Sequence, residues 1–214
     1  MNRLPGILTL AALCGACAMA QEAPLEDAFI GYSFLRVNSA QQIPAFTANG
    51  GVATLAWNLN NHLGVELEFG GYHNGNVNHL PFDTTSFSYL LGPRVSWGRT
   101  KKIDPYLHVL VGANWAISSI AKSALLTPTS RVVVAPSGRY EDSQASFAMA
   151  AGGGLDIQIN KYVLFRPVQI DYYLTDFNTP NLFPAPGQPP VTTSNKIQNN
   201  LRYAAGIVFT FTVQ

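Results

Sequence analysis

The feature that most limits the fold of this chain is an alternation of bulky apolar residues with small or polar ones. It is clearest at the end, LRYAAGIVFTFTVQ, where Leu201, Tyr203 and Phe209 share one parity while Arg202 and Thr210 share the other. Successive side chains of a β-strand point to opposite faces. This segment is therefore predicted to be a strand with one apolar face and one small or polar face.

The same alternation occurs in eight segments: residues 28–37, 51–59, 63–73, 86–98, 106–117, 146–159, 165–175 and 201–214. One irregularity interrupts it. Arg166 falls on the apolar parity of its segment, so we expect a β-bulge near Pro167 that resets the phase.

The connections between these segments alternate between short and long. The short ones lie near Asn60, at 99–104 and at 160–161; the long ones are 38–50, 73–85, 118–144 and 176–198. An even-stranded meander with short turns at one end and long loops at the other is the layout of an outer-membrane barrel. The predicted fold is therefore all-β, an eight-stranded antiparallel up-and-down transmembrane β-barrel. Its short turns would face the periplasm and its long loops the cell exterior.

A soluble β-protein would also alternate, so the direction of the apolar face needs its own argument. A water-facing polar set would be rich in lysine, but all five lysines lie in turns or loops, and the polar set is mostly small. Trp57 and Trp97 come just before tight turns and Trp115 just before a long loop, where interfacial aromatic residues are found. These features favour lipid around the apolar face and a narrow lumen inside.

The first residues predict a secretory signal peptide. Arg3 precedes an apolar stretch, and Ala18-Met19-Ala20 forms a small-x-small cleavage site. Residues 1–20 would be removed, leaving a barrel domain at 21–214 in the bacterial outer membrane. Both cysteines and Arg3 leave with the signal, so the mature chain is cysteine-free and has equal numbers of basic and acidic residues. This balance argues against nucleic acid as a partner.

Six stretches carry a likeness to a known family: FIGYSFLRVN, NLNNHLGVELEFGGYH, SYLLGPRVSW, FAMAAGGGLDIQIN, VQIDYYLT and NNLRYAAGIVFTF. With them the mature chain resembles the OmpA-like outer-membrane β-barrel domain of the porin family, in a short form without a peptidoglycan-binding module. The resemblance implies two partners, the lipid of the outer membrane and the barrel-assembly machinery. It also implies that Gly206, Phe209 and Phe211 form the assembly signal, although Ala204 replaces the usual polar residue and the chain continues past Phe211.

Seven ionisable residues share the parity of the lumen: Glu66, Glu68, Arg94, His108, Asp156, Asp171 and Arg202. They could form a proton or ion path, a paired-carboxylate active site, or a structural network that fills the barrel. Buried charges need partners, and two arginines among four acids can supply them, so we favour the structural network. No catalytic residue, metal ligand or cofactor site is predicted.

Three functions remain open from the sequence. In the favoured one, a non-enzymatic protein of the cell envelope presents its long loops, chiefly 118–144 and 176–198, to an extracellular ligand that the sequence does not identify. The alternatives are a small-solute or ion channel of low conductance and a lipid-modifying enzyme of the outer membrane. The enzyme is disfavoured because no histidine has a serine and an acid at a matching position on the same rim.

Overall fold

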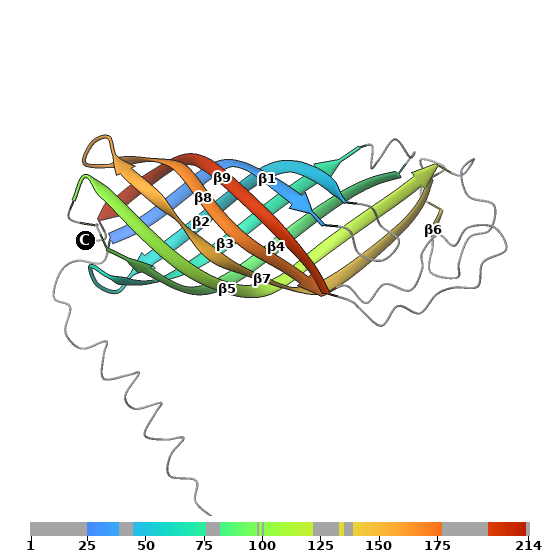
Figure 1. The fold of residues 1–214 in the computed structure, drawn as a ribbon, viewed down its shortest axis with the longest axis horizontal. Helices are drawn as coiled ribbons and strands as arrows, with labels where there is room; N and C mark the ends of the chain where they lie inside the picture. The colour runs from blue at the N-terminus through green and yellow to red at the C-terminus, as the bar shows by residue number, and fades with distance from the viewer. Residues whose placement is uncertain are drawn as a thin grey trace, which may run out of the picture.

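In the computed structural model, residues 25–38, 45–75, 82–97, 99, 101–121, 133–134, 139–176 and 197–212 are described. The cleavage-site residues Ala18 and Ala20 lie outside them. The described strands are β1 (Leu25–Val37), β2 (Phe46–Asn58), β3 (Leu63–Asn74), β4 (Phe82–Ser96), β5 (Ile103–Ala121), β6 (Val133–Val134), β7 (Arg139–Gln158), β8 (Val163–Asp176) and β9 (Ile197–Thr212). Figure 1 shows all of them except β6 wound into one barrel.

Eight of these strands close into an antiparallel ring, which confirms the predicted fold. Each long strand pairs with the next one along the chain, and β1 pairs with β9 to complete the circle. The two-residue strand β6 pairs only with β7, outside the ring. The C-terminal strand places Phe209 opposite Ala28 and Phe211 opposite Glu26. Because the ring is closed, each of its eight described strands is paired on both sides.

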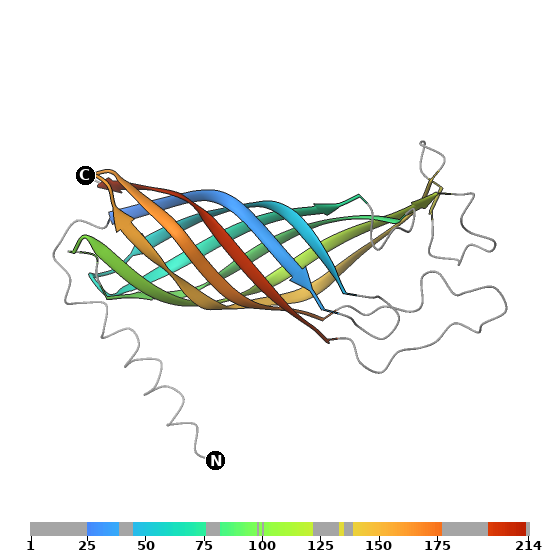
Figure 2. The ribbon, with the colours of Figure 1, turned by 45° about the horizontal axis from the view of Figure 1, so that its top comes forward.

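The register of the pairs makes the barrel narrow and its strands steeply tilted. The stagger of the ring can be traced from Ala28. Following the paired residue on each neighbouring strand, through β2, β3, β4, β5, β7 and β8, leads to Asn199 on β9. Ala28 itself pairs directly with Phe209, ten residues further along β9. A stagger of ten residues over eight strands corresponds to a tilt of about 40°. Figures 1 and 2 show this slant. The interior of such a barrel is small enough for side chains to fill.

The apolar face of every strand points outward, as predicted. Ile30 is 63% exposed and Leu107 55%, whereas Glu66 and Arg202 on the other face are fully buried. Exposed aromatic residues lie toward both ends of the strands. Trp57, Trp97, Tyr162 and Phe211 are near the short turns, and Tyr32, Trp115, Phe147 and Tyr172 are nearer the long connections. Among the described residues, no helix is long and apolar enough to span a membrane.

Several strands extend further than the sequence indicated, and β2 begins at Phe46, within the predicted loop 38–50. β5 continues to Ala121 and β7 begins at Arg139, so the predicted loop 118–144 is partly strand, and Trp115 lies six residues inside β5. β4 likewise begins at Phe82, within the predicted loop 73–85. The polar ends of these strands pair with one another, Ser119 with both Asp83 and Glu141. Paired backbone satisfies its own hydrogen bonds, so the ladder continues after the apolar pattern has ended.

The bulge expected near Pro167 is confirmed. The β8–β9 register shifts between Arg166 and Gln169, and the β7–β8 register shifts between Leu155 and Ile157. Proline has no N–H for the ladder, and the free carbonyl of Pro167 accepts a hydrogen bond from the Tyr203 hydroxyl at 2.7 Å. The shift turns Arg166 from the lipid-facing parity into the lumen.

Candidate functional site

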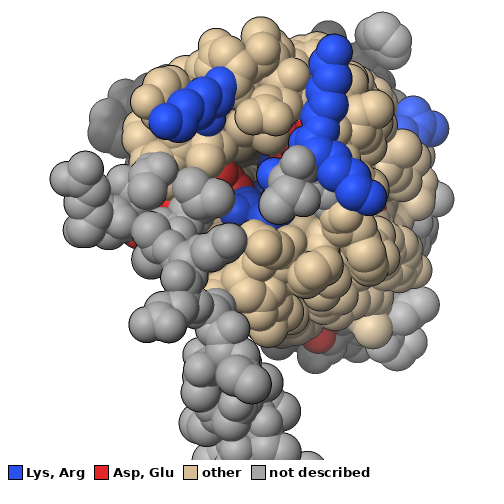
Figure 3. Space-filling model, turned by 90° about the vertical axis from the view of Figure 1, so that its left-hand side faces the viewer, with Lys and Arg blue, Asp and Glu red and all other residues tan. Residues whose placement is uncertain are grey.

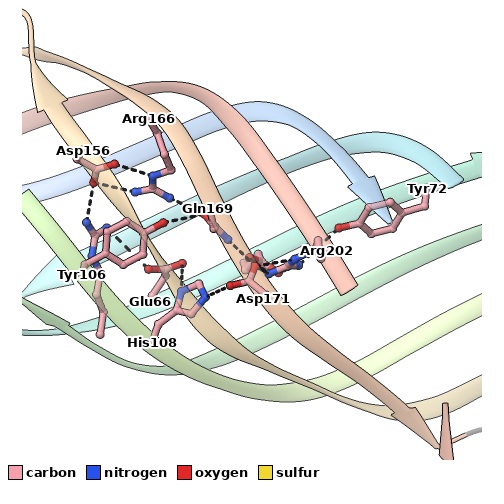
Figure 4. A network of polar contacts seen from close by, with 11 residues as sticks. Glu66, Tyr72, Tyr106, His108, Asp156, Arg166, Gln169, Asp171 and Arg202 are labelled. Atoms are coloured by element: carbon pink, nitrogen blue, oxygen red, sulfur yellow. Dashed lines mark hydrogen bonds and ion pairs between the residues drawn. The ribbon is translucent and has the colours of Figure 1, made fainter. Parts of the chain in front are cut away.

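The structure places all seven ionisable residues of the lumen set inside the barrel, where none is more than 3% exposed. They come from six strands, β3, β4, β5, β7, β8 and β9. Figure 4 shows most of this set converging on the barrel axis as one connected group. The network consists of two clusters of ion pairs joined by a histidine and a glutamine.

The first cluster centres on the carboxylate of Asp156. Arg94 donates to it at 2.8 Å, and Arg166 donates from Nε at 2.7 Å and from Nη2 at 3.0 Å. Both guanidinium groups also lie close to the ring of Tyr106, with distances to its centroid of 3.9 Å from Arg94 and 4.5 Å from Arg166. Asp156 therefore holds two arginines that would otherwise repel each other, and the aromatic face gives each a second favourable contact.

The second cluster centres on the guanidinium of Arg202. It donates to both carboxylate oxygens of Glu68, at 2.8 Å for Oε2, and its Nε donates to Asp171 at 2.8 Å. Its Nη1 also lies 3.5 Å from the Tyr72 hydroxyl. This fork of donors between two acids is the geometry in which arginine binds carboxylates most strongly.

His108 lies between two carboxylates and links the clusters. Its Nε2 is 2.8 Å from Asp171, and its Nδ1 is 3.2 Å from Glu66. A neutral imidazole has only one N–H, so the arrangement fits an imidazolium that donates on both sides. With Arg94, Arg166 and Arg202, a charged His108 balances the four acids Glu66, Glu68, Asp156 and Asp171.

Gln169 provides the second link. Its Oε1 accepts from the Tyr106 hydroxyl at 2.8 Å and from Arg166 at 2.9 Å, while its amide donates to Asp171 at 2.9 Å. Four of the network's residues were therefore missed in the sequence: Arg166, Tyr106, Gln169 and Tyr72. Arg166 was placed on the apolar parity, and the others are uncharged, so a search limited to ionisable residues passed over them.

An apolar layer covers the network on the side of the long connections. It consists of nine buried residues from seven strands: Leu35, Val37, Ala48, Tyr72, Leu90, Leu110, Ala148, Ala150 and Tyr173, with Phe46 packed against them. Leu110 and Ala148 are fully buried. Since all but β9 contribute, this apolar cap crosses the whole lumen.

The opposite mouth, at the short turns, is polar. Asp27 accepts from Asn58 at 3.1 Å and from Thr210 at 2.9 Å, and it forms an ion pair with Arg99. Figure 3 looks onto this end and shows acidic and basic atoms inside a central hollow. The lumen is therefore charged from this mouth to its middle, then crossed by the apolar layer, and beyond that layer it is lined by uncharged polar residues such as Asn114 and Ser146.

The geometry of the network suits a set of paired, fixed charges better than a catalytic site. Both ring nitrogens of His108 face carboxylates, so neither is available to accept a proton from a serine or water nucleophile. The four acids have arginine or histidine partners, whereas the carboxylate pair of an aspartic protease shares a proton between its two acids. No group of histidine and acidic residues suited to a metal ion occurs in the part of the chain that the structure describes.

Comparison with solved structures identifies the architecture. Ail, the attachment invasion locus protein of Yersinia pestis, aligns with a TM-score of 0.56 at 15% identity, over 89% of this chain and 100% of Ail. OprG of Pseudomonas aeruginosa aligns with a TM-score of 0.52 at 15% identity, over 90% and 98% of the two chains. Neisserial surface protein A gives 0.52 at 11% identity, over 89% and 98%.

The fold is that of the small OmpA-like outer-membrane barrels. This agrees with the family resemblance seen in the sequence. No protein-family model matches the chain, and no curated protein matches it by sequence. At such low sequence identities the likeness shows the fold alone. The function of this outer-membrane-type barrel must therefore be argued from its own residues.

Proposed function

We propose that this protein is an integral protein of the bacterial outer membrane whose closed barrel carries surface loops that contact an extracellular ligand. The outward face supports the membrane location. Large apolar side chains such as Ile30, Leu91 and Val109 are 49–63% exposed. In water such a face would be an aggregation surface, whereas in a bilayer it is the expected one.

The observation that carries the proposed role is the double obstruction of the lumen. An ion entering from the short-turn mouth meets the clusters around Asp156 and Arg202, whose groups are already paired. Beyond them it meets the apolar cap, where Leu90 and Leu110 offer no hydrogen-bonding group. Taking an ion through an apolar constriction is costly. The barrel therefore acts as a rigid support, and a low-conductance channel is disfavoured.

The contact surface would be formed by the long connections and by the strand ends that carry them. β4, β5 and β7 continue beyond the end of β1, and Glu141 of β7 lies opposite Ser119 there. Most of 118–144 and nearly all of 176–198 lie outside the described residues. Ail, whose fold is similar, is named the attachment invasion locus protein and has been crystallised with the heparin analogue sucrose octasulfate. For this chain we propose attachment as the class of function and leave the ligand's chemistry open.

The first test is membrane fractionation combined with gel mobility. A closed barrel in the outer-membrane fraction should run as a compact, faster band when unboiled and as a slower band after boiling. A protein found in the soluble periplasm without a mobility shift would disprove the membrane assignment.

Two further measurements separate scaffold from channel. Purified protein in planar bilayers should give no ion conductance above the lipid background, and steady conductance would favour the channel. Cells that display the barrel should bind host-surface or matrix preparations, and replacing 122–132 with a short Gly-Ser linker should abolish that binding while the heat-modifiable band remains. Binding that survives replacement of both long connections would contradict the surface-loop role.

A further inference from the structure

Three of the chain's five lysines lie in two neighbouring turns at the short-turn end. Lys101 and Lys102 lie between β4 and β5, and Lys161 lies between β7 and β8. The two turns are neighbours because β5 pairs with β7, and the Gln158 amide donates to the Lys102 carbonyl at 2.8 Å. All three side chains are exposed. We call these residues the lysine corner.

The positive charge of the lysine corner is not neutralised by nearby acids in the described part of the chain. Arg99 pairs with Asp27 inside the mouth, and Asp104 is only 4% exposed. The partly exposed Glu26 is on β1, four strands from β5 and two strands from β8 in the ring. Figure 3 shows exposed basic side chains at separate places along the upper rim of the mouth, with uncharged residues between them. The β2–β3 turn, LNNH, has no basic residue other than His62.

The lysine corner borders directly on the lipid-facing surface. Trp97 is 51% exposed, and its amide donates to the Pro105 carbonyl on β5 at 3.0 Å. Ile103 is 50% exposed and pairs with Ile157, while Ile159 is 62% exposed. Tyr162 is 59% exposed, and the Lys161 ammonium lies 5.4 Å from its ring centroid. The basic groups therefore border a strip of exposed apolar side chains, here called the apolar track (Ile103 and Ile159), which has the aromatic residues Trp97 and Tyr162 beside it.

We propose that the lysine corner binds the phosphate of an anionic phospholipid in the periplasmic leaflet, with an acyl chain along Ile103 and Ile159. Lysine chains reach water while their stems cover apolar surface, and ammonium groups at a membrane surface attract anionic headgroups. The adjoining apolar track favours a lipid over peptidoglycan, an anionic polymer that would need no such track. The inference rests on the proposed membrane location but not on the loop function.

The test uses tryptophan fluorescence, because the chain has three tryptophans and two lie at this end. A W57F/W115F variant reports from Trp97, beside the lysine corner. A W97F/W115F variant reports from Trp57, on β2 at the opposite side of the mouth. Each is reconstituted in phosphatidylcholine vesicles that contain a minor fraction of dibrominated lipid, either phosphatidylglycerol or phosphatidylcholine. Bromine quenches tryptophan only at short range, so quenching measures local lipid composition in either orientation of the protein.

We expect brominated phosphatidylglycerol to be enriched at Trp97 by about tenfold over phosphatidylcholine, and Trp57 to show little preference. The substitutions Lys101→Gln, Lys102→Gln and Lys161→Gln together should abolish the enrichment. The control Lys122→Gln with Lys196→Gln, which removes the two lysine charges of the long connections, should leave it intact. High salt should weaken the enrichment.

Equal quenching by the two lipids at Trp97, or an enrichment that survives the triple substitution, would overturn the proposal. Lysine-dependent sedimentation with purified peptidoglycan, without lipid preference, would assign the corner to the polymer instead and also overturn it. The heat-modifiable band of each variant is checked first. A variant that keeps the band but loses the enrichment shows that the site has been removed and the barrel has not.

Discussion

Removing Arg202 should destabilise the barrel more than almost any other single substitution in the lumen. The arginine is fully buried and donates to both oxygens of Glu68 and to Asp171. In Arg202→Met the side chain keeps much of its length but loses every one of these donors. Glu68 is then left in the lumen without a cation beside it, while Asp171 still has His108 and Gln169.

The magnitude follows from the number of charges left unpaired. Breaking a buried ion pair by removing one partner costs about 3–5 kcal/mol. We expect the free energy of unfolding to fall by that amount in Arg202→Met. Neutralising the stranded acid should recover much of it, so Glu68→Gln with Arg202→Met should lose about 2 kcal/mol less than Arg202→Met alone.

The assay is equilibrium unfolding in urea of the barrel folded into detergent micelles or lipid vesicles, read from the ratio of the compact and slow gel bands. Arg36→Met is the matched control, because Arg36 is exposed near the end of β1 and should change stability by less than about 0.5 kcal/mol. If Arg202→Met costs less than about 1 kcal/mol, or if the double variant is no more stable than it, the ion pairs do not hold the lumen together as argued.

Three further outcomes are expected. Gly206→Ala should at least halve the heat-modifiable fraction, because a Cβ there would lie 2.2 Å from a β1 carbonyl oxygen. The control Gly51→Ala should fold normally, because the atom nearest to its added Cβ is 3.5 Å away. Equal folding yields of the two variants would contradict this account of barrel closure. Phe211→Ala should lower the amount in the outer membrane several-fold while the purified protein still folds in detergent, and unchanged abundance would remove Phe211 from the assembly signal. Leu110→Ser should raise bilayer conductance by making the apolar cap wettable, while Leu91→Ala on the lipid face should not; an unchanged conductance would show that the cap is not the barrier.

The fold could be predicted because its main constraint affects every second residue. A strand between lipid and a narrow lumen must alternate throughout its length, so a single segment such as 201–214 already carries the pattern, and eight repeats with alternating connection lengths determine the layout. The alternation is lost at strand ends that do not face lipid, because outward side chains there need not be apolar. The polar ends of β5 and β7 were therefore assigned to a loop, although they pair as far as Ala121 and Arg139.

Parity also placed the charged residues in the lumen, but it could not say which of them meet. Partners in the network are distant in sequence, as with Arg202 and Glu68 or Arg94 and Asp156. Their meeting depends on the stagger between strands, which no single segment encodes. The proposed assembly signal, lipid partner and signal peptide lie outside what the barrel's own geometry can test, and they remain predictions.

The charge balance of the predicted lumen residues already indicated that one cation was missing from the set. The predicted set had four acids but only two arginines and His108, so at least one acid lacked a cation even with His108 protonated. An unpaired carboxylate in a filled lumen is costly, which implies that another cation had to turn inward. Arg166 was the candidate, since a guanidinium facing lipid is equally costly and Pro167 offered the bulge to redirect it. The structure shows that arginine bound to Asp156 by two hydrogen bonds, so an electrostatic count corrects the strand parity at Arg166.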